Sequence, residues 1–288
     1  SDDCKPSLEG FLLQAHEDLD GKLVVLGSEE QRDGSLDVFV YGANATGKAL
    51  TTADFASAQV SVSVDGSLSA LAEGDFTVTA VADAPDDFLS MALVNDYSGS
   101  MSDEDLKTVA TMETDILTYL PPVYEGSVTQ FSTEIVPKLD FTTDNDALRA
   151  AVAYDAELDR DLTALYDGMA TGLAGLVKRP RPLKLLIVAT DGMENSSKTA
   201  SRSDVTRAIA DSGVAVVMLG GLFSKPSDLR ELAGRRGVYF YTPFYDDARA
   251  QLADFLEALT NLSKVNIPKE KRGDGPVSID AGDSHGEL

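Results

Sequence analysis

The pattern of hydrophobic and polar residues changes near residue 86. Before this point, short segments alternate apolar with polar residues; the segment 60–64, for example, alternates strictly and ends at Asp65-Gly66. Alternation buries one face of a β-strand, and Asp-Gly favours a tight hairpin turn. We therefore predict a small antiparallel β unit over residues 20–85, which packs on the next domain because four strands are few for an independent fold. Its predicted strands are residues 22–26, 36–41, 60–64 and 76–81.

After residue 86 the pattern becomes one of apolar strands separated by helices. The segment 183–189 is almost continuously apolar, as expected for a strand in the middle of a parallel sheet. Alternating strands and helices predict an α/β fold, a doubly wound and mostly parallel sheet with helices on both faces, over residues 86–266. Its predicted strands are residues 88–94, 127–136, 183–189, 214–219 and 238–241, and its predicted helices are 103–120, 144–158, 164–178, 203–211, 227–235 and 246–262.

The two ends of the chain carry weaker patterns. Residues 1–19 are interpreted as an N-terminal extension. Residues 267–288 are polar and repeat glycine and aspartate, so we expect a disordered tail there.

The charge of the chain narrows the choice of partners. It has 24 Lys and Arg against 48 Asp and Glu, which gives a net charge of −24 at pH 7. Such a surface repels phosphate backbones and anionic lipid, so no nucleic-acid partner is expected, and it attracts divalent cations. No run of about 18 apolar residues is present, so no transmembrane segment is expected either.

Cysteine and histidine are scarce. The single Cys4 forms no disulfide within the chain and excludes a zinc site built on several cysteines. Its place near the start leaves a lipid anchor open, although Ser1-Asp2-Asp3 lacks the apolar residues of a lipoprotein signal, so an incidental thiol is favoured. His16 and His285 lie far apart, and a catalytic site built around histidine is not expected.

Polar residues follow two of the predicted strands at the point where they end. Residues 95–101 come after the first strand of the α/β domain, and Thr190-Asp191-Gly192 comes after the strand 183–189. Between them, residues 161–167 open a helix with the hydroxyl of Thr163. Ligands of open α/β sheets bind at the carboxyl ends of the strands, so these segments are candidates for a shared site.

The first of these segments has the spacing of a cation site. In Asp96-x-Ser98-x-Ser100, alternate residues of an extended turn point one way, so that a carboxylate and two hydroxyls converge, and Gly99 lets the backbone turn closely. Such oxygens are hard ligands that suit Mg²⁺, Ca²⁺ or Mn²⁺. Taken alone, these residues fit ordinary turn and helix-cap positions equally well.

Residues 86 to about 266 resemble a von Willebrand factor A domain, the fold shared with integrin I domains. Relatives often have glycines where this chain has Arg160-Asp161-Leu162. The resemblance rests on three segments in order: Val94-Asn95-Asp96-Tyr97-Ser98-Gly99-Ser100-Met101, similar to the family's metal-ion-dependent adhesion site motif; Thr163 within Thr-Ala-Leu-Tyr-Asp, similar to its second metal loop; and Asp191 within Thr-Asp-Gly-Met-Glu-Asn, similar to its third.

The resemblance implies a metal site and a kind of partner. It implies that Mg²⁺, with Ca²⁺ or Mn²⁺ as alternatives, completes its shell with an exposed Asp or Glu of a protein partner. In this scheme Ser98, Ser100 and Thr163 coordinate the ion directly, and Asp96 and Asp191 hold it directly or through waters. Asp167 and Glu194, near these motifs, either support the ligand residues from behind or are solvated carboxylates, and the solvated alternative is favoured.

The β-rich segment carries a second, fainter resemblance. Residues 38–40, 47–55 and 64–66 look like the Ig-like segment that precedes the A domain in some exported bacterial proteins. This resemblance implies a bacterial protein located in the periplasm, at the cell surface or outside the cell.

Three hypotheses of function follow. The first is a binding module, not an enzyme, that acts in adhesion or in the assembly of a complex. The second is a structural subunit with an empty metal site. The third is a metal-assisted hydrolase with Asp191 or Glu194 as general base, which no further feature of the sequence supports.

Overall fold

The computed structural model of the 288-residue chain describes residues 22–83, 88–119, 124–155, 160–192, 194–234, 236–241, 257–282 and 284–287. The predicted extension 1–19, with Cys4 and His16, lies outside these residues. So does most of the predicted helix 246–262: residues 257–262 of it are described, of which 257–260 are helical and 261–262 are not.

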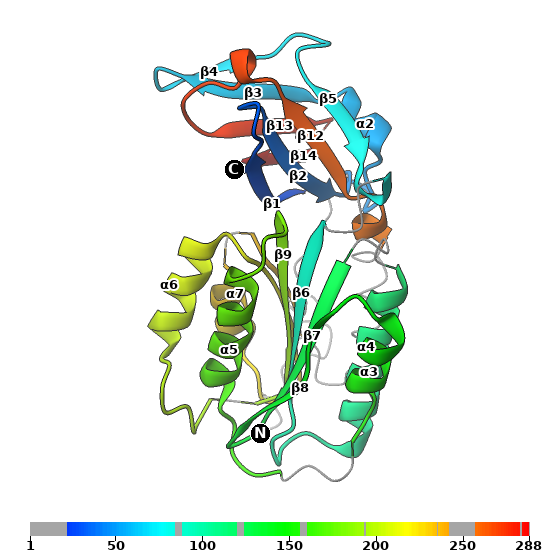
Figure 1. The fold of residues 1–288 in the computed structure, drawn as a ribbon, viewed down its shortest axis with the longest axis vertical. Coiled ribbons are helices and arrows are strands. Elements are labelled where there is room, and N and C mark those ends of the chain that lie inside the picture. Colours follow the sequence, from blue (N-terminus) through cyan, green and yellow to red (C-terminus); the bar gives the residue numbers. More distant parts are fainter. Residues whose placement is uncertain are drawn as a thin grey trace, which may run out of the picture.

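A six-stranded sheet forms the centre of the larger domain (Figure 1). Its order is β11-β10-β9-β6-β7-β8, and every pair is parallel except β7–β8. The predicted doubly wound, mostly parallel α/β fold is therefore confirmed. The strands are β6 (Leu89–Asp96), β7 (Tyr124–Phe131), β8 (Ile135–Thr142), β9 (Leu183–Thr190), β10 (Ala215–Gly220) and β11 (Val238–Tyr241).

The prediction of a single strand over residues 127–136 is wrong. It is the hairpin of β7 and β8, which turns at residues 132–134, where the N–H of Ser132 donates to the carbonyl of Glu134 (3.0 Å). The polar turn is short, and the apolar residues on both sides of it read as one run.

Helices cover both faces of the sheet. One face carries α3 (Asp103–Tyr119) and α4 (Asn145–Val152), and the other carries α5 (Leu165–Val177), α6 (Arg202–Ser212) and α7 (Pro226–Ala233). Ser102 begins α3 as predicted: its hydroxyl accepts from the N–H of Asp105 (3.1 Å), whose carboxylate accepts from the N–H of Ser102 (3.1 Å). No helix among the described residues is long and apolar enough to cross a membrane.

The β unit is a sandwich of two four-stranded sheets above the α/β domain (Figure 1). Val38 and Val40 of β2 face the interior of the sandwich, whereas Phe39 and Tyr41, which alternate with them, face the α/β domain. The ring of Phe39 packs edge-on against Phe88, with the ring centroids 4.8 Å apart. One sheet consists of β1 (Leu23–Glu30), β2 (Leu36–Gly42), β12 (Ser263–Ile267) and β5 (Thr77–Ala80). The other consists of β14 (Ser284–Glu287), β13 (Val277–Ala281), β3 (Gln59–Val64) and β4 (Ser67–Ala70). The short helix α2 (Thr52–Ala56) precedes β3.

The prediction of a disordered tail over 267–288 is wrong in the structure. β13 pairs with β3, and β14 pairs with β13, so the tail supplies half of one sheet. Val277, Ile279 and Ala281 alternate with polar residues and are buried in the sandwich. The alternation is only five residues long and lies among glycine and aspartate, which is why composition hides it. The sandwich therefore combines strands that precede the α/β domain along the chain with strands that follow it.

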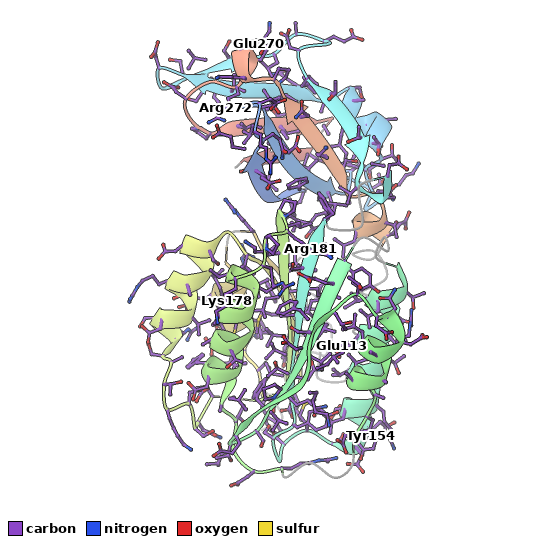
Figure 2. All side chains as sticks on the ribbon, viewed as in Figure 1. Glu113, Tyr154, Lys178, Arg181, Glu270 and Arg272 are labelled. Carbon is purple, nitrogen blue, oxygen red and sulfur yellow. The ribbon has the colours of Figure 1, made fainter. Side chains whose placement is uncertain are left out.

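The two ends of the α/β domain face different surroundings. Residues 180–184, which lead into β9, lie beside residues 27–29 of the sandwich, so the amino ends of the central strands face it. Figure 2 labels Arg181 at this end and Tyr154 at the opposite end. The carboxyl ends of β6 and β9 therefore point away from the sandwich.

Candidate metal centre

The structure brings the five predicted ligand residues together at the carboxyl edge of the sheet. Asp96 ends β6, Ser98 and Ser100 follow it, Asp191 comes directly after β9, and Thr163 precedes α5. The hydroxyl of Ser100 donates to Oδ1 of Asp191 (2.8 Å) and lies 3.2 Å from the hydroxyl of Ser98. Three loops that are far apart in sequence thus meet at one point.

Gly192 marks the space between these oxygens. A Cβ placed on residue 192 would lie 3.3 Å from Oγ1 of Thr163, 3.4 Å from Oγ of Ser100 and 3.6 Å from Oδ2 of Asp96. These oxygens converge on a space that the absence of a side chain at position 192 keeps open. Two hydroxyls and a carboxylate around one cradle fit a hard divalent cation.

Asp96 is the buried anchor of the site. Oδ2 accepts from the hydroxyl of Thr190 (2.6 Å), and Oδ1 accepts from the backbone N–H of Ser98 (2.8 Å). Burial raises the pKa of Asp96 to about 6, although the hydrogen bonds from Ser98 and Thr190 oppose the rise. Burial also raises the pKa of Asp191. A divalent cation between the two carboxylates would favour their charged forms and reverse both shifts.

The loop that carries Thr163 is held by backbone hydrogen bonds. The carbonyl of Asp161 accepts from the N–H of Gly99 (2.9 Å), and a Cβ on Gly99 would lie 3.3 Å from that oxygen. The N–H of Thr163 donates to the side chain of Asn195 (2.8 Å). Relatives often have glycines in the loop that precedes this threonine. In this chain the close approach of the two loops is possible because Gly99, in the facing loop, has no side chain.

Glu194 and Asp167 are not the solvated carboxylates expected from the sequence. Glu194 accepts hydrogen bonds from three backbone N–H groups, those of Tyr166, Ser196 and Ser197. Asp167 accepts from the N–H groups of residues 198–200, and these bonds lower its pKa against the opposing effect of burial. Both carboxylates fasten the loop after β9 to the start of α5. No pattern in the sequence signals this role, because the bonds that link the loop to α5 join residues 28 to 33 positions apart.

Three exposed, large apolar side chains lie on segments that adjoin the site. Leu162 adjoins Thr163, and the loop with Leu222 and Phe223 is tied to Asp191, whose carbonyl accepts from the N–H of Phe223 (2.7 Å). These three side chains are 43%, 52% and 52% exposed. They are half of the six large hydrophobic side chains that are exposed in the described part of the chain. Such clustering is typical of a surface that a partner covers.

The ligand set is poor in acidic groups. The described residues contain no cluster of three or more His, Cys, Asp or Glu that could hold a metal ion. The candidate centre instead combines two carboxylates with three hydroxyls, so a bound cation would keep much of its positive charge.

The chain belongs to the von Willebrand factor type A domain family, whose model matches residues 90–258. Comparison with curated proteins finds no match.

Two solved structures show the same fold. One is proximal thread matrix protein 1 from the mussel byssus with a zinc-occupied MIDAS motif, at 18% identity and a TM-score of 0.56; the alignment covers 67% of this chain and 50% of that chain. The other is BatB from Bacteroides thetaiotaomicron, at 14% identity and a TM-score of 0.50, with 60% of this chain and 98% of that chain covered. The chain thus spans about half the length of the mussel protein.

Proposed function

We propose that this protein is a divalent-cation-dependent protein-binding module that captures an acidic residue of its partner. The observation that carries the proposal is the convergence of the Asp96, Ser100 and Thr163 oxygens on the cradle at Gly192. Ser98 and Asp191 complete the ligand set that we propose. A cation bound there would offer a coordination position to an incoming carboxylate.

The apolar rim supports a protein partner. A cation alone would bind a carboxylate on any small molecule, but exposed Leu162, Leu222 and Phe223 offer area that only a larger partner can bury. Among the comparisons, the mussel protein is named as a thread matrix protein, which fits a role in adhesion or assembly outside the cell. We propose the same kind of role and an exported location for this chain.

We propose Mg²⁺ as the bound cation, with Ca²⁺ or Mn²⁺ as alternatives. Hydroxyl and carboxylate oxygens are the hard ligands that these ions prefer. The zinc in the mussel structure shows that such a motif also accepts a softer ion in a relative. Zn²⁺ therefore belongs in any comparison of affinities.

The test is calorimetric titration of the chelator-treated protein with each cation. We expect one site in the wild type, no measurable site in Asp96→Ala or Thr163→Ala, and an unchanged site in Glu104→Gln. Glu104 is an exposed acidic residue in the first turn of α3, so its variant controls for the loss of charge alone. A wild type that binds no cation, or an Asp96→Ala variant that binds as well as the wild type, would refute the proposed centre.

The structure gives the hydrolase hypothesis no added support. Glu194 is occupied with backbone N–H groups and is not placed as a free base. A subunit with an empty site differs from our proposal in a measurable way, because only a cation that binds the folded chain raises its melting temperature.

A further inference from the structure

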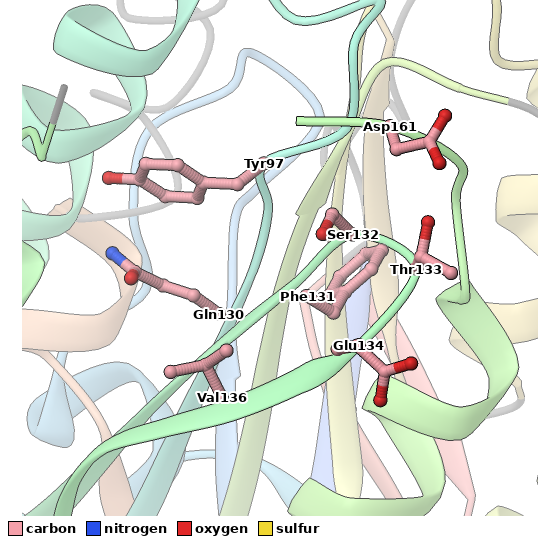
Figure 3. A pocket seen from close by; sticks show the side chains of 8 residues that line it. All are labelled: Tyr97, Gln130, Phe131, Ser132, Thr133, Glu134, Val136 and Asp161. Atoms are coloured by element: carbon pink, nitrogen blue, oxygen red, sulfur yellow. The ribbon is translucent and has the colours of Figure 1, made fainter. Parts of the chain in front are cut away.

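A pocket of about 270 Å³ lies beside the candidate metal centre. One of its walls is Tyr97, which directly follows Asp96 in the chain. Asp161 also lines it, and the carbonyl of Asp161 accepts from the N–H of Gly99 in the metal loop (2.9 Å). The pocket therefore adjoins the centre on two sides, although none of the five proposed ligands lines it. Figure 3 shows its lining from close by.

Gln130 lines this pocket with an unpaired amide. Its side chain is 1% exposed, and neither Nε2 nor Oε1 has a hydrogen-bond partner. In Figure 3 it points to the same side of the β7–β8 hairpin as Tyr97 and Val136. A buried amide without partners is costly, and such groups in folded proteins are nearly always satisfied.

The polar side chains next to Gln130 do not pair with its amide. Its parallel neighbour in the sheet is Asn95, whose Nδ2 donates to Glu113 (2.8 Å) on α3. Oδ1 of Asn95 and Oε1 of Glu113 also have no hydrogen-bond partner, and neither side chain makes a hydrogen bond to Gln130. Gln130 lines the pocket, so a group that enters the pocket comes next to this residue.

A carboxamide is the group whose hydrogen-bond donor and acceptor match those of the Gln130 side chain. Gln130 offers an N–H donor and a carbonyl acceptor side by side, and a second carboxamide satisfies both with two reciprocal hydrogen bonds. The ring of Tyr97 and the side chain of Val136 provide apolar walls for the carbons behind such a group. A guanidinium or ammonium has no acceptor for Nε2.

Charge at the pocket argues against an anion. Glu134 and Asp161 both line it and are exposed, and the side chain of Glu134 is 79% exposed. Nζ of Lys198 lies 3.4 Å from Oε1 of Glu134 and offsets part of that charge, but the carboxylate of Asp161 still repels an anion, whereas a neutral carboxamide meets no such penalty. The acidic residue of a partner is thereby directed to the metal centre and away from this pocket.

We propose that the pocket binds the side-chain amide of an Asn or Gln in the same protein partner whose acidic residue reaches the metal centre. The link to a single partner rests on the proposed function; the amide specificity rests on the pocket alone. Because the pocket and the centre share the loop of Asp96 and Tyr97, a few residues of a partner span both. An acidic residue and an amide residue close together in sequence thus define the recognised motif.

The first experiment tests the pocket without the metal. The full chain, labelled with ¹⁵N, is titrated with propionamide in EDTA and in Mg²⁺. NMR follows the side-chain NH₂ signal of Gln130 and the backbone N–H signals of the residues that line the pocket; the backbone signals also report binding in a variant without Gln130. We expect a saturable shift under both conditions, no comparable shift with propionate, and binding weaker by roughly tenfold or more in Gln130→Met, which lacks the two hydrogen bonds.

Three results would overturn the proposal. They are no shift of the Gln130 signal, equal shifts with propionamide and propionate, and equal binding by folded Gln130→Met. The first result would mean that ordered water satisfies the amide. Since the fragment is neutral and EDTA is one of the conditions, a failed metal centre leaves this result readable.

The second experiment tests the link to one partner. Peptides with one Asp and one Gln, separated by one to four glycines, are compared with peptides in which Leu replaces Gln. We expect one spacing to bind at least about tenfold more tightly than its Leu counterpart in Mg²⁺, because the second contact becomes intramolecular. An equal affinity at every spacing refutes the shared partner. A preference for Gln that persists unchanged in EDTA instead refutes the role of the metal.

Discussion

Gly192 is the residue whose size matters most to the proposed centre. The Cβ of Gly192→Ala would lie within 3.6 Å of oxygens from Thr163, Ser100 and Asp96, in the space that a cation would need. We expect Mg²⁺ affinity to fall by more than about tenfold, while the melting temperature in EDTA changes only modestly because the one tight contact of that Cβ, at 3.3 Å, is with the side-chain hydroxyl of Thr163, which needs to shift by only a few tenths of an ångström. Calorimetry and thermal unfolding of the same samples measure both quantities.

The matched control is Gly27→Ala, whose Cβ would have no neighbour within 4 Å in the sandwich. It should bind Mg²⁺ like the wild type. Wild-type affinity in Gly192→Ala would show that the cation lies somewhere else.

The pKa of Asp96 predicts how cation binding depends on pH. Burial raises this pKa to about 6, so below that pH the carboxyl binds a proton that a cation must displace. The apparent affinity for Mg²⁺ should be nearly constant above pH 7 and should fall by about tenfold for each pH unit below 6. Titrations at pH 5, 6, 7 and 8 measure this, and affinity that does not change between pH 5 and 8 would contradict it.

At the residue scale, the sequence predicts the side chains that converge at the site better than it predicts the residues that support them. Asp96, Ser98 and Ser100 are recognisable because alternate residues of one loop converge just after a strand. Thr190 and Asn195 are not, since a hydroxyl or amide that orients another loop has no spacing to reveal it. The same holds for the unpaired amide of Gln130, which looks like any polar residue in a strand.

Within the element α3, Glu113 is buried against β6 with a single partner, Asn95. Burial raises its pKa from 4.5 to about 8. Between these values the folded state binds a proton that the unfolded state has lost. This contribution to stability is therefore complete below about pH 4.5, falls as pH rises, and is gone above about pH 8.

Glu113→Gln keeps an oxygen for Asn95 and removes the titration. We expect the variant to gain stability relative to wild type as pH rises from 5 to 8, by on the order of a few kcal/mol, since one pKa unit is worth about 1.4 kcal/mol. Urea unfolding in EDTA at both pH values measures the gap. A gap that is the same at pH 5 and pH 8 would mean that Glu113 keeps its ordinary pKa.

Elements were predictable where their patterns are long. The apolar strand β9 and the helices α3 and α5 appear within a few residues of their predicted bounds. The sequence predicts one strand where β7 and β8 are two, because a three-residue turn barely interrupts the apolar pattern.

On the scale of the whole molecule, the C-terminal strands are part of the folded sandwich. Ile279 of β13 is fully buried beside Val60 of β3. Ile279→Ala should lower the free energy of unfolding by about 2–5 kcal/mol, as expected for a large-to-small change in a core. The control Leu68→Ala, at a site 64% exposed in β4, should change it by less than about 0.5 kcal/mol.

Urea unfolding of both variants checks this prediction. If residues 267–288 were disordered, Ile279→Ala would have no effect. Composition misled here because the strands that complete the sandwich lie about 200 residues from the first ones, and no local pattern announces that pairing.

The position of the A domain inside the sandwich sequence has a mechanical consequence. The chain leaves the sandwich after β5 and returns at β12, and these two strands are antiparallel neighbours in one sheet. A force applied at the candidate metal centre therefore reaches the sandwich through both connections at the same end of this strand pair, and it pulls β5 and β12 together. The other side of β12 is paired with β2 over residues 263–267, and tension along the strands shears this whole ladder at once instead of opening it bond by bond. This arrangement of strands favours resistance of the sandwich to a force applied at the α/β domain.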